Sequence, residues 1–289
     1  MKPRTDSIYF ETICDRYTPY SLAKKIGANA ILESASFSKG KERYSILMAE
    51  EAFRIIQDDE GIAFIIDGRR VPFAPESSSK SLNAVGQEKN ADILDALLYV
   101  ASQNTMPAMD IPLPASGIGY LSYEFAARCD TIHFSSQVDE LHIPESDFIA
   151  GHIYIVFDHF TEKLHVFALN YAEHQIDLQK AVDSLKKRLN DMDFSYLEGP
   201  EDPSPCTVIT DLECSKAEYI EKVLQLKKYI TAGDIIQAVP SRRLQIESTV
   251  SAMEIYRRLR SINPSPYLLY IDFSSFQLIG SSPESLVRV

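Results

Sequence analysis

Short apolar runs broken by charged or turn residues fill the first part of the chain, a pattern that is typical of β-strands. The runs predict four strands, at residues 29–35, 43–49, 53–57 and 62–66. Between the last two runs, the segment Asp59-Glu60-Gly61 predicts the turn of a hairpin. A polar stretch at residues 75–90 follows, and we interpret it as a surface loop.

In the middle of the chain, the apolar spacing switches between the helical and the strand period. It predicts helices at residues 92–103 and 175–190, and strands at residues 117–123, 149–157 and 163–169, of which the last two pair. Three prolines within residues 198–206 exclude a continuous element. We therefore place a domain boundary there, between an N-terminal region of residues 1–200 and a second region of residues 201–289.

Two helix-start signals follow the prolines. Ser215 with Glu218, and Ser251 with Glu254, each match the capping-box pattern that begins a helix. Gly233 is placed to end the first of these helices. The sequence thus predicts two capped helices in the second region.

The second region also contains strand-like runs. Residues 235–246 predict one strand, and residues 267–273 with 276–279 predict a hairpin. The last residues, 285–289, look like the beginning of a further strand and indicate that this region is incomplete. Many strands with few clear helices indicate the α+β class, here an antiparallel β-sheet sandwich with peripheral helices.

Composition limits the class of protein. The chain has 289 residues, 45% hydrophobic and 24% charged, which excludes collagen-like and wholly disordered proteins. No apolar run approaches the ~18 residues that span a bilayer, and the polar N-terminus has no signal core. Four cysteines without a C-x-x-C pair are typical of reduced thiols, so we expect a cytoplasmic protein.

Charge and generic motifs exclude several functions. The net charge of −12 argues against binding to nucleic acid or to an anionic membrane, although a local cation could still hold a small anion. Gly117 and Gly119 lack the third glycine of a dinucleotide fingerprint. The six histidines show no metal-ligand spacing, and neither a P-loop nor a G-x-S-x-G elbow is present.

More specific signals come from short segments that occur in a fixed order. They are Ile31-Leu32-Glu33-Ser34 followed by Arg43-Tyr44-Ser45, then Gly119-Tyr120-Leu121-Ser122-Tyr123, Phe157-Asp158-His159, Ala232-Gly233-Asp234-Ile235-Ile236-Gln237, Asn263-Pro264-Ser265-Pro266-Tyr267 and Gly280-Ser281-Ser282-Pro283-Glu284. In order and spacing they resemble the large, chorismate-binding subunit of anthranilate synthase, component I. The resemblance runs from about residue 8 to the C-terminus and covers the N-terminal portion of that family.

The resemblance implies a tryptophan feedback pocket formed by Glu33, Ser34, Pro266, Tyr267 and Leu268. Bound tryptophan needs an apolar slot together with polar groups for its ammonium and carboxylate. Ser34 offers a hydroxyl and Glu33 a charge, while Pro266 and Tyr267 offer a rigid, partly aromatic wall. Taken alone, the same residues also fit a strand end and a helix-stop turn. Leu268 stands where the family usually has methionine, a change that conserves volume.

Two further residues match catalytic positions of the family. Gln237 stands where relatives that add water carry a lysine base, and an amide cannot act as a base near neutral pH. Glutamine there suits an ammonia nucleophile, which needs no such activation. Glu284 matches the carboxylic acid that protonates the departing 4-hydroxyl of chorismate. From the residues alone, a strand amide for Gln237 and an exposed turn for Glu284 remain alternatives.

The implied activity is amination of chorismate and elimination of pyruvate to give anthranilate, in tryptophan biosynthesis. The implied cofactor is Mg²⁺, and the implied partner is a glutamine amidotransferase subunit, component II, which supplies ammonia. The family's magnesium-binding glutamates and catalytic histidine would lie beyond Val289, so we expect an incomplete chorismate-binding domain, no metal ligand in this chain and no turnover by it alone.

Two other functions fit the same residues. The large subunit of aminodeoxychorismate synthase, in folate synthesis, shares the Ile31–Ser34 type of element and an ammonia nucleophile. The segments 263–267 and 280–282 favour the anthranilate branch. A non-catalytic tryptophan-binding module is the second alternative.

Overall fold

The backbone of the computed structural model is described for residues 6–36, 40–41, 43–74, 91–104, 106–107, 109–134, 141–191 and 205–287. The predicted surface loop at 75–90 lies outside these residues. The chain forms two compact units, unit 1 with residues 1–196 and 256–289, and unit 2 with residues 197–255. The functional division at residue 200 stays a prediction.

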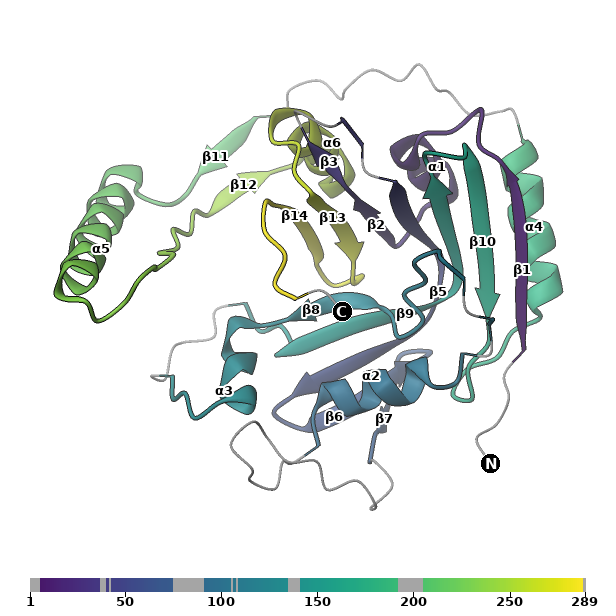
Figure 1. The fold of residues 1–289 in the computed structure, drawn as a ribbon, viewed down its shortest axis with the longest axis horizontal. Helices are drawn as coiled ribbons and strands as arrows, with labels where there is room; N and C mark the ends of the chain where they lie inside the picture. The colour runs from purple at the N-terminus through teal and green to yellow at the C-terminus, as the bar shows by residue number, and fades with distance from the viewer. Residues whose placement is uncertain are drawn as a thin grey trace. The chain divides into compact units, whose positions relative to one another are not determined.

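Unit 1 is built on a ten-stranded sheet (Figure 1). Its strands are β1 (Ser7–Ile13), β2 (Ala30–Glu33), β5 (Tyr44–Asp58), β6 (Gly61–Ile66), β7 (Arg69–Pro72), β8 (Ile118–Leu121), β9 (Ser146–Asp158), β10 (Lys163–Leu169), β13 (Tyr267–Asp272) and β14 (Gln277–Ser282). The main path runs β1-β10-β9-β5-β2-β13-β14, with β6 and β7 attached to β5 and with β8 attached to β9. Every pairing among these strands is antiparallel. The α+β class with an antiparallel sheet is therefore confirmed, while the sandwich arrangement stays a prediction.

Helices lie beside this sheet (Figure 1). They are α1 (Pro19–Ile26), α2 (Ile93–Ala101), α3 (Ala126–Cys129), α4 (Leu178–Asn190) and α6 (Ala252–Ile262), with a 3-10 turn at Tyr123–Phe125. A short separate pair, β3 (Ala35–Ser36) with β4 (Gly40–Lys41), follows β2. The predicted helices at 92–103 and 175–190 are confirmed, and Asp92 caps the first of them by accepting from Leu94 N–H at 2.9 Å.

The prediction of two separate strands at 43–49 and 53–57 was wrong. β5 is one strand that pairs with β9 along most of its length, and the register shifts between Met48 and Phe53. Glu50 and Glu51 lie between the two apolar runs, and irregular pairing of this kind lets a strand continue past extra residues. The first half of β5 pairs with β2 and the second half with β6.

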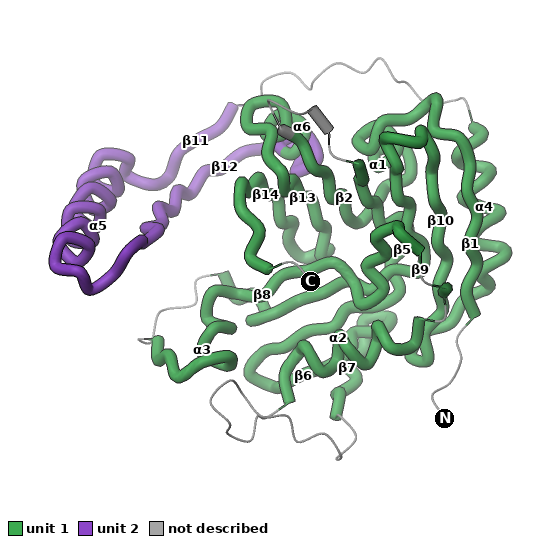
Figure 2. Tube along the Cα trace, in the orientation of Figure 1, with its two compact units in different colours: residues 1–196, 256–289 green, residues 197–255 purple. Residues whose placement is uncertain are grey.

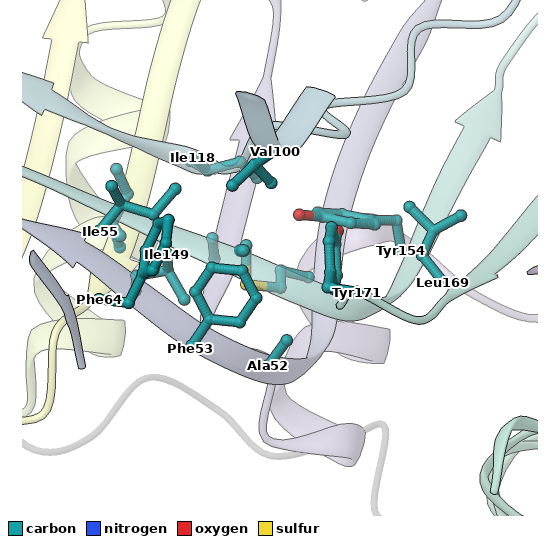
Figure 3. Packing of buried hydrophobic residues seen from close by; sticks show 14 of the residues in the cluster. Ala52, Phe53, Ile55, Phe64, Val100, Ile118, Ile149, Tyr154, Leu169 and Tyr171 are labelled. Atoms are coloured by element: carbon teal, nitrogen blue, oxygen red, sulfur yellow. The ribbon is translucent and has the colours of Figure 1, made fainter. Parts of the chain in front are cut away.

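The core of unit 1 lies against β5 and β9. Phe53 is 1% exposed and meets Phe64 and Tyr171 edge to face, at ring-centroid distances of 5.4 Å and 5.2 Å (Figure 3). Ile118 of β8 and Val100 of α2 belong to the same cluster of buried residues. Such aromatic pairs stabilise beyond their buried area, by about 0.5–1.5 kcal/mol each.

Unit 2 contains β11 (Cys206–Val208), α5 (Leu212–Ala232) and β12 (Ile246–Ser248) (Figure 2). Gly233 ends α5 with φ +86°, as predicted. Ser215 does not begin this helix; Asp211 caps it, accepting from the N–H groups of Glu213 and Cys214 at 3.0 Å. An Asp at the N-cap position is an equally good acceptor, so the more C-terminal Ser215 lies inside the helix.

The strand predicted at 235–246 was also wrong. Only residues 246–248 form a strand there, since they pair with β11 and the residues before them have no regular ladder among the described residues. An apolar run becomes a strand only where a neighbouring strand accepts its backbone hydrogen bonds.

Candidate functional site

Strands β2 and β13 bring together two segments that are far apart in the sequence. The strands are antiparallel, with Leu268 opposite Glu33. Ala35 N–H donates to Ser265 C=O at 3.0 Å, so the contact continues past the end of β2. The structure therefore places the five predicted tryptophan-binding residues on one pair of neighbouring strand ends.

The side chains of these residues do not share one face of the sheet. Opposite residues of an antiparallel pair point to the same face, and successive residues alternate. Glu33 and Leu268 share a face, and both are buried, at 6% and 2% exposure. Tyr267, one step from Leu268 along β13, lies on the other face and is 44% exposed, while Ser34 follows the last residue of β2 and is half-buried. Ser34, Pro266 and Tyr267 are thus the three of the five residues that are not buried.

The Glu33 carboxylate is held by helix α6. Tyr256 donates its hydroxyl to Glu33 Oε2 at 2.6 Å, and Arg260 donates from Nη2 to Oε1 at 3.0 Å. Burial and the neighbouring Glu33 charge raise the pKa of Tyr256, so its hydroxyl remains a proton donor. Sequence reasoning missed Tyr256 and Arg260. Their spacing of four residues, which puts both on one face of a helix, was the available signal.

The turn between α6 and β13 is bound to the end of β14. α6 ends at Ile262, directly before Asn263-Pro264, because a residue that precedes proline disfavours the helical conformation. Ser265, 4% exposed, donates its hydroxyl to Ser282 C=O, and Ser281 donates to Asn263 C=O at 2.8 Å. The two matched segments 263–267 and 280–284 therefore stabilise each other, whatever they bind.

The two predicted catalytic residues lie in different units. Glu284 follows β14 in unit 1, is exposed, and donates its backbone N–H to Ser282 Oγ at 3.4 Å. Gln237 is exposed in the irregular segment before β12, in unit 2. A general acid that works near neutral pH needs burial or a neighbouring negative charge to raise its pKa. The described residues do not bury Glu284, so its role stays a prediction.

Two other matched segments join the start of β5 to the end of β9. Arg43 Nη2 lies 3.0 Å from Asp158 Oδ2, and Ser45 Oγ lies 2.8 Å from His159 Nε2. Burial raises the pKa of Asp158. Hydrogen bonds from Arg43 and from the backbone N–H groups of Phe160 and Thr161 outweigh that effect and hold the pKa of Asp158 at about 2. These contacts give the segments 43–45 and 157–159 a structural role.

Two cavities lie elsewhere in unit 1, and neither includes Ser34 or Tyr267. One, of about 610 Å³, lies between β1 and α4, and the other, of about 330 Å³, lies beside the start of α1 and includes Asp158 and His159. Across the described ranges, no three His, Cys, Asp or Glu side chains come close enough to hold a metal ion. No helix in the described part of the chain is long and apolar enough to cross a membrane.

The sequence profile of the chorismate binding enzyme family matches residues 57–289, well over half of the chain. The chain belongs to this family. It is 42% identical over 276 residues to anthranilate synthase component 1 of Spirochaeta aurantia, covering 95% of this chain and 55% of the relative. The corresponding protein of Acetivibrio thermocellus is 28% identical over 299 residues, covering 98% of this chain and 56% of the relative.

A solved structure shares this fold. Anthranilate synthase component I from Streptococcus pneumoniae matches with a TM-score of 0.59 at 25% identity, over 85% of this chain and 51% of that one. The chain thus spans about half the length of the relatives that it matches. The resemblance inferred from short segments is confirmed at the level of the chorismate-binding family.

Proposed function

We propose that this chain is the tryptophan-binding part, and the first section of the catalytic part, of an anthranilate synthase component I. The observation that carries the proposal is the 42% identity to the Spirochaeta aurantia protein over 95% of the chain. The pairing of β2 with β13 supports the regulatory half of the proposal, because it brings the segment that contains Ser34 close to the segment that contains Pro266 and Tyr267. We place the protein in the cytoplasm, on the basis of its composition.

The reaction that we propose forms a bond from ammonia nitrogen to C2 of chorismate while the bond from C4 to its hydroxyl breaks. Glu284 donates the proton with which that hydroxyl leaves as water, and elimination of pyruvate then gives anthranilate. Gln237 stays neutral and takes no proton. A glutamine amidotransferase subunit supplies ammonia. Mg²⁺ would neutralise the substrate carboxylates, with ligands from the region of the relatives that this chain does not span.

A chimera tests the proposed chemistry. Residues 1–289 would replace the matching region of the Spirochaeta aurantia protein, and anthranilate would be followed by its fluorescence with chorismate, ammonium and Mg²⁺. We expect turnover by the chimera and none by the 289-residue chain alone. Glu284→Gln in the chimera should lower kcat about 100-fold, because an amide cannot protonate the leaving hydroxyl.

The matched control is Glu124→Gln, which changes an exposed glutamate outside the site and should leave kcat unchanged. Unchanged turnover in Glu284→Gln would exclude Glu284 as the acid. Formation of 4-amino-4-deoxychorismate in place of anthranilate would instead support the folate-branch enzyme.

Tryptophan binding tests the regulatory half of the proposal with the chain itself. The protein has no tryptophan, so indole fluorescence in a mixture belongs to the ligand. We expect a rise in its polarisation on binding. Tyr267→Ala should raise the Kd at least about tenfold, because it removes the aromatic wall beside Ser34.

Tyr123→Ala is the control, since Tyr123 is 81% exposed and its ring packs on Phe134, at a ring-centroid distance of 5.4 Å. It should bind tryptophan as the unchanged chain does. A folded chain that shows no polarisation change at millimolar tryptophan would contradict the pocket. Equal effects of Tyr267→Ala and Tyr123→Ala on the Kd would mean that Tyr267 is not part of the pocket.

A further inference from the structure

The polar cluster of Glu33, Tyr256 and Arg260 lies directly behind the proposed tryptophan pocket. Both carboxylate oxygens of Glu33 are partnered, one by each α6 side chain. The Glu33 side chain is only 3% exposed, so water does not replace these donors. Figure 1 shows α6 beside the ends of β2 and β13. Because its carboxylate is buried and fully partnered, Glu33 does not contact a ligand beside Ser34 directly.

The cluster is held from several sides. The Arg260 guanidinium lies over the Tyr20 ring of α1, with Cζ 5.7 Å from the ring centroid. Tyr256 is completely buried, and its ring lies 6.1 Å from that of Tyr270 on β13. A planar guanidinium that contacts an aromatic face and a carboxylate together has little freedom to move. The donors to Glu33 are therefore fixed in place.

We propose that Tyr256 and Arg260 are positioning residues for tryptophan, which act through the Glu33 carboxylate to fix the end of β2 and with it the hydroxyl of Ser34. The inference rests on the proposed tryptophan pocket and says how that pocket is held in shape. Ser34 is the next residue after Glu33, so a shift of the Glu33 backbone moves Ser34 as well. Beyond Glu33, a backbone hydrogen bond from Ala35 to Ser265 links the same segment to the α6–β13 turn.

The energetic reason is the cost of an unpartnered buried charge. A buried carboxylate that loses one of its donors either remains unsatisfied or moves toward water. A carboxylate that moves toward water displaces the end of β2, and one that stays unsatisfied lets the end of β2 fluctuate. Both weaken a ligand that needs Ser34 and Tyr267 at a fixed separation, because binding must then also restore the order of the strand end.

The test measures the Kd for L-tryptophan by ligand polarisation in the 289-residue chain, well below its unfolding temperature. Tyr256→Phe removes the hydroxyl alone, and Arg260→Met removes the charge while keeping much of the side-chain volume. We expect each to raise the Kd about tenfold, equivalent to about 1.4 kcal/mol. Arg260→Lys keeps a charge without the fork geometry, so it should rescue part of the affinity and give an intermediate Kd.

Tyr171→Phe is the matched control. Tyr171 is 2% exposed and donates its hydroxyl to Gly151 C=O at 3.0 Å, so the substitution also removes a buried hydrogen bond, but far along the sheet from Glu33. It should lower the Tm and leave the Kd unchanged. A purely structural role of Tyr256 would give the same result as Tyr171.

Three results separate the two ideas. Tenfold weakening in Tyr256→Phe and Arg260→Met, with an unchanged Tyr171→Phe, supports the positioning role. Wild-type affinity in a folded Tyr256→Phe variant overturns the positioning role but not the pocket. If Tyr256→Phe does not fold, wild-type affinity in both Arg260→Lys and Arg260→Met overturns that role in the same way. A folded wild-type chain that does not bind tryptophan overturns the pocket, and the positioning role with it.

Discussion

Replacing Arg54 by methionine is expected to destabilise the protein by about 3–5 kcal/mol, as for other buried ion pairs that lose one partner. Arg54 of β5 donates from Nε to Asp147 Oδ1 at 3.1 Å and pairs through Nη2 with the second oxygen. Asp147 of β9 is completely buried, so methionine would leave its carboxylate without a counter-charge. Arg54 also lies over the Phe273 ring, at 5.7 Å, and the substitution loses that contact as well.

The loss should depend on pH. Burial raises the pKa of Asp147, and the hydrogen bond and charge of Arg54 lower it in part. Without Arg54 the pKa of Asp147 in the folded state rises further, so the folded variant binds more protons than its unfolded state between the two pKa values. A carboxyl with a raised folded-state pKa favours folding below its unfolded pKa and loses that benefit as pH rises through the folded pKa. The deficit of the variant should therefore be smaller at about pH 4 than at about pH 8.

Urea denaturation at both pH values measures this deficit, and two variants control it. Arg128→Met removes a partner of Glu145 from a pair whose side chains are 39% and 21% exposed, and it should cost about 1 kcal/mol or less. Arg54→Met combined with Asp147→Leu removes both charges and should regain most of the loss. If the double variant is as unstable as Arg54→Met, the lost packing of Arg54, not the stranded charge, is responsible.

The sequence predicted most of the local elements because their signals lie within a few residues. The β5–β6 hairpin is one case: Asp58 pairs with Gly61 across Asp59 and Glu60, two of the three residues that the sequence indicated for the turn. The second capping box is another, since Ser251 Oγ accepts from Glu254 N–H at 3.3 Å. In both cases the residues that determine the structure are in contact along the chain itself.

Apart from the misplaced cap of α5, the errors lie where partners distant in the sequence decide. The continuity of β5 depends on β9, because the two strands stay paired on both sides of the irregular pairing near Glu50. The strand expected at 235–246 lacked a neighbour over most of its length. Likewise, Glu33 could be named as a candidate from its motif, but its partners Tyr256 and Arg260 could not, because only the folded chain brings α6 to β2. Register and tertiary hydrogen bonds are not encoded in local spacing.

Gly117 and Gly119 do not form a dinucleotide fingerprint, and the packing of β8 explains them instead. β8 pairs with β9, with Gly119 opposite Phe148. A Cβ atom on Gly119 would lie 2.0 Å from Asp147 O and 2.5 Å from Phe148 Cα, both backbone atoms. At Gly117, where φ is +108°, it would lie 2.6 Å from Ile149 O. Glycine is therefore required for β8 to approach β9 this closely.

We accordingly expect Gly119→Ala to destabilise the protein by about 3 kcal/mol or more, at the upper end of the cost of overpacking, because backbone atoms must move to admit the methyl group. Urea denaturation gives the free energy of unfolding, and hydrogen exchange should show lost protection in residues 118–121 first. Gly280→Ala is the matched control. A Cβ there would meet only the Leu269 side chain, at 3.1 Å, which can shift, so the cost should stay below about 1.5 kcal/mol. Equal losses in the two variants would mean that the close approach of β8 to β9 does not explain the glycine.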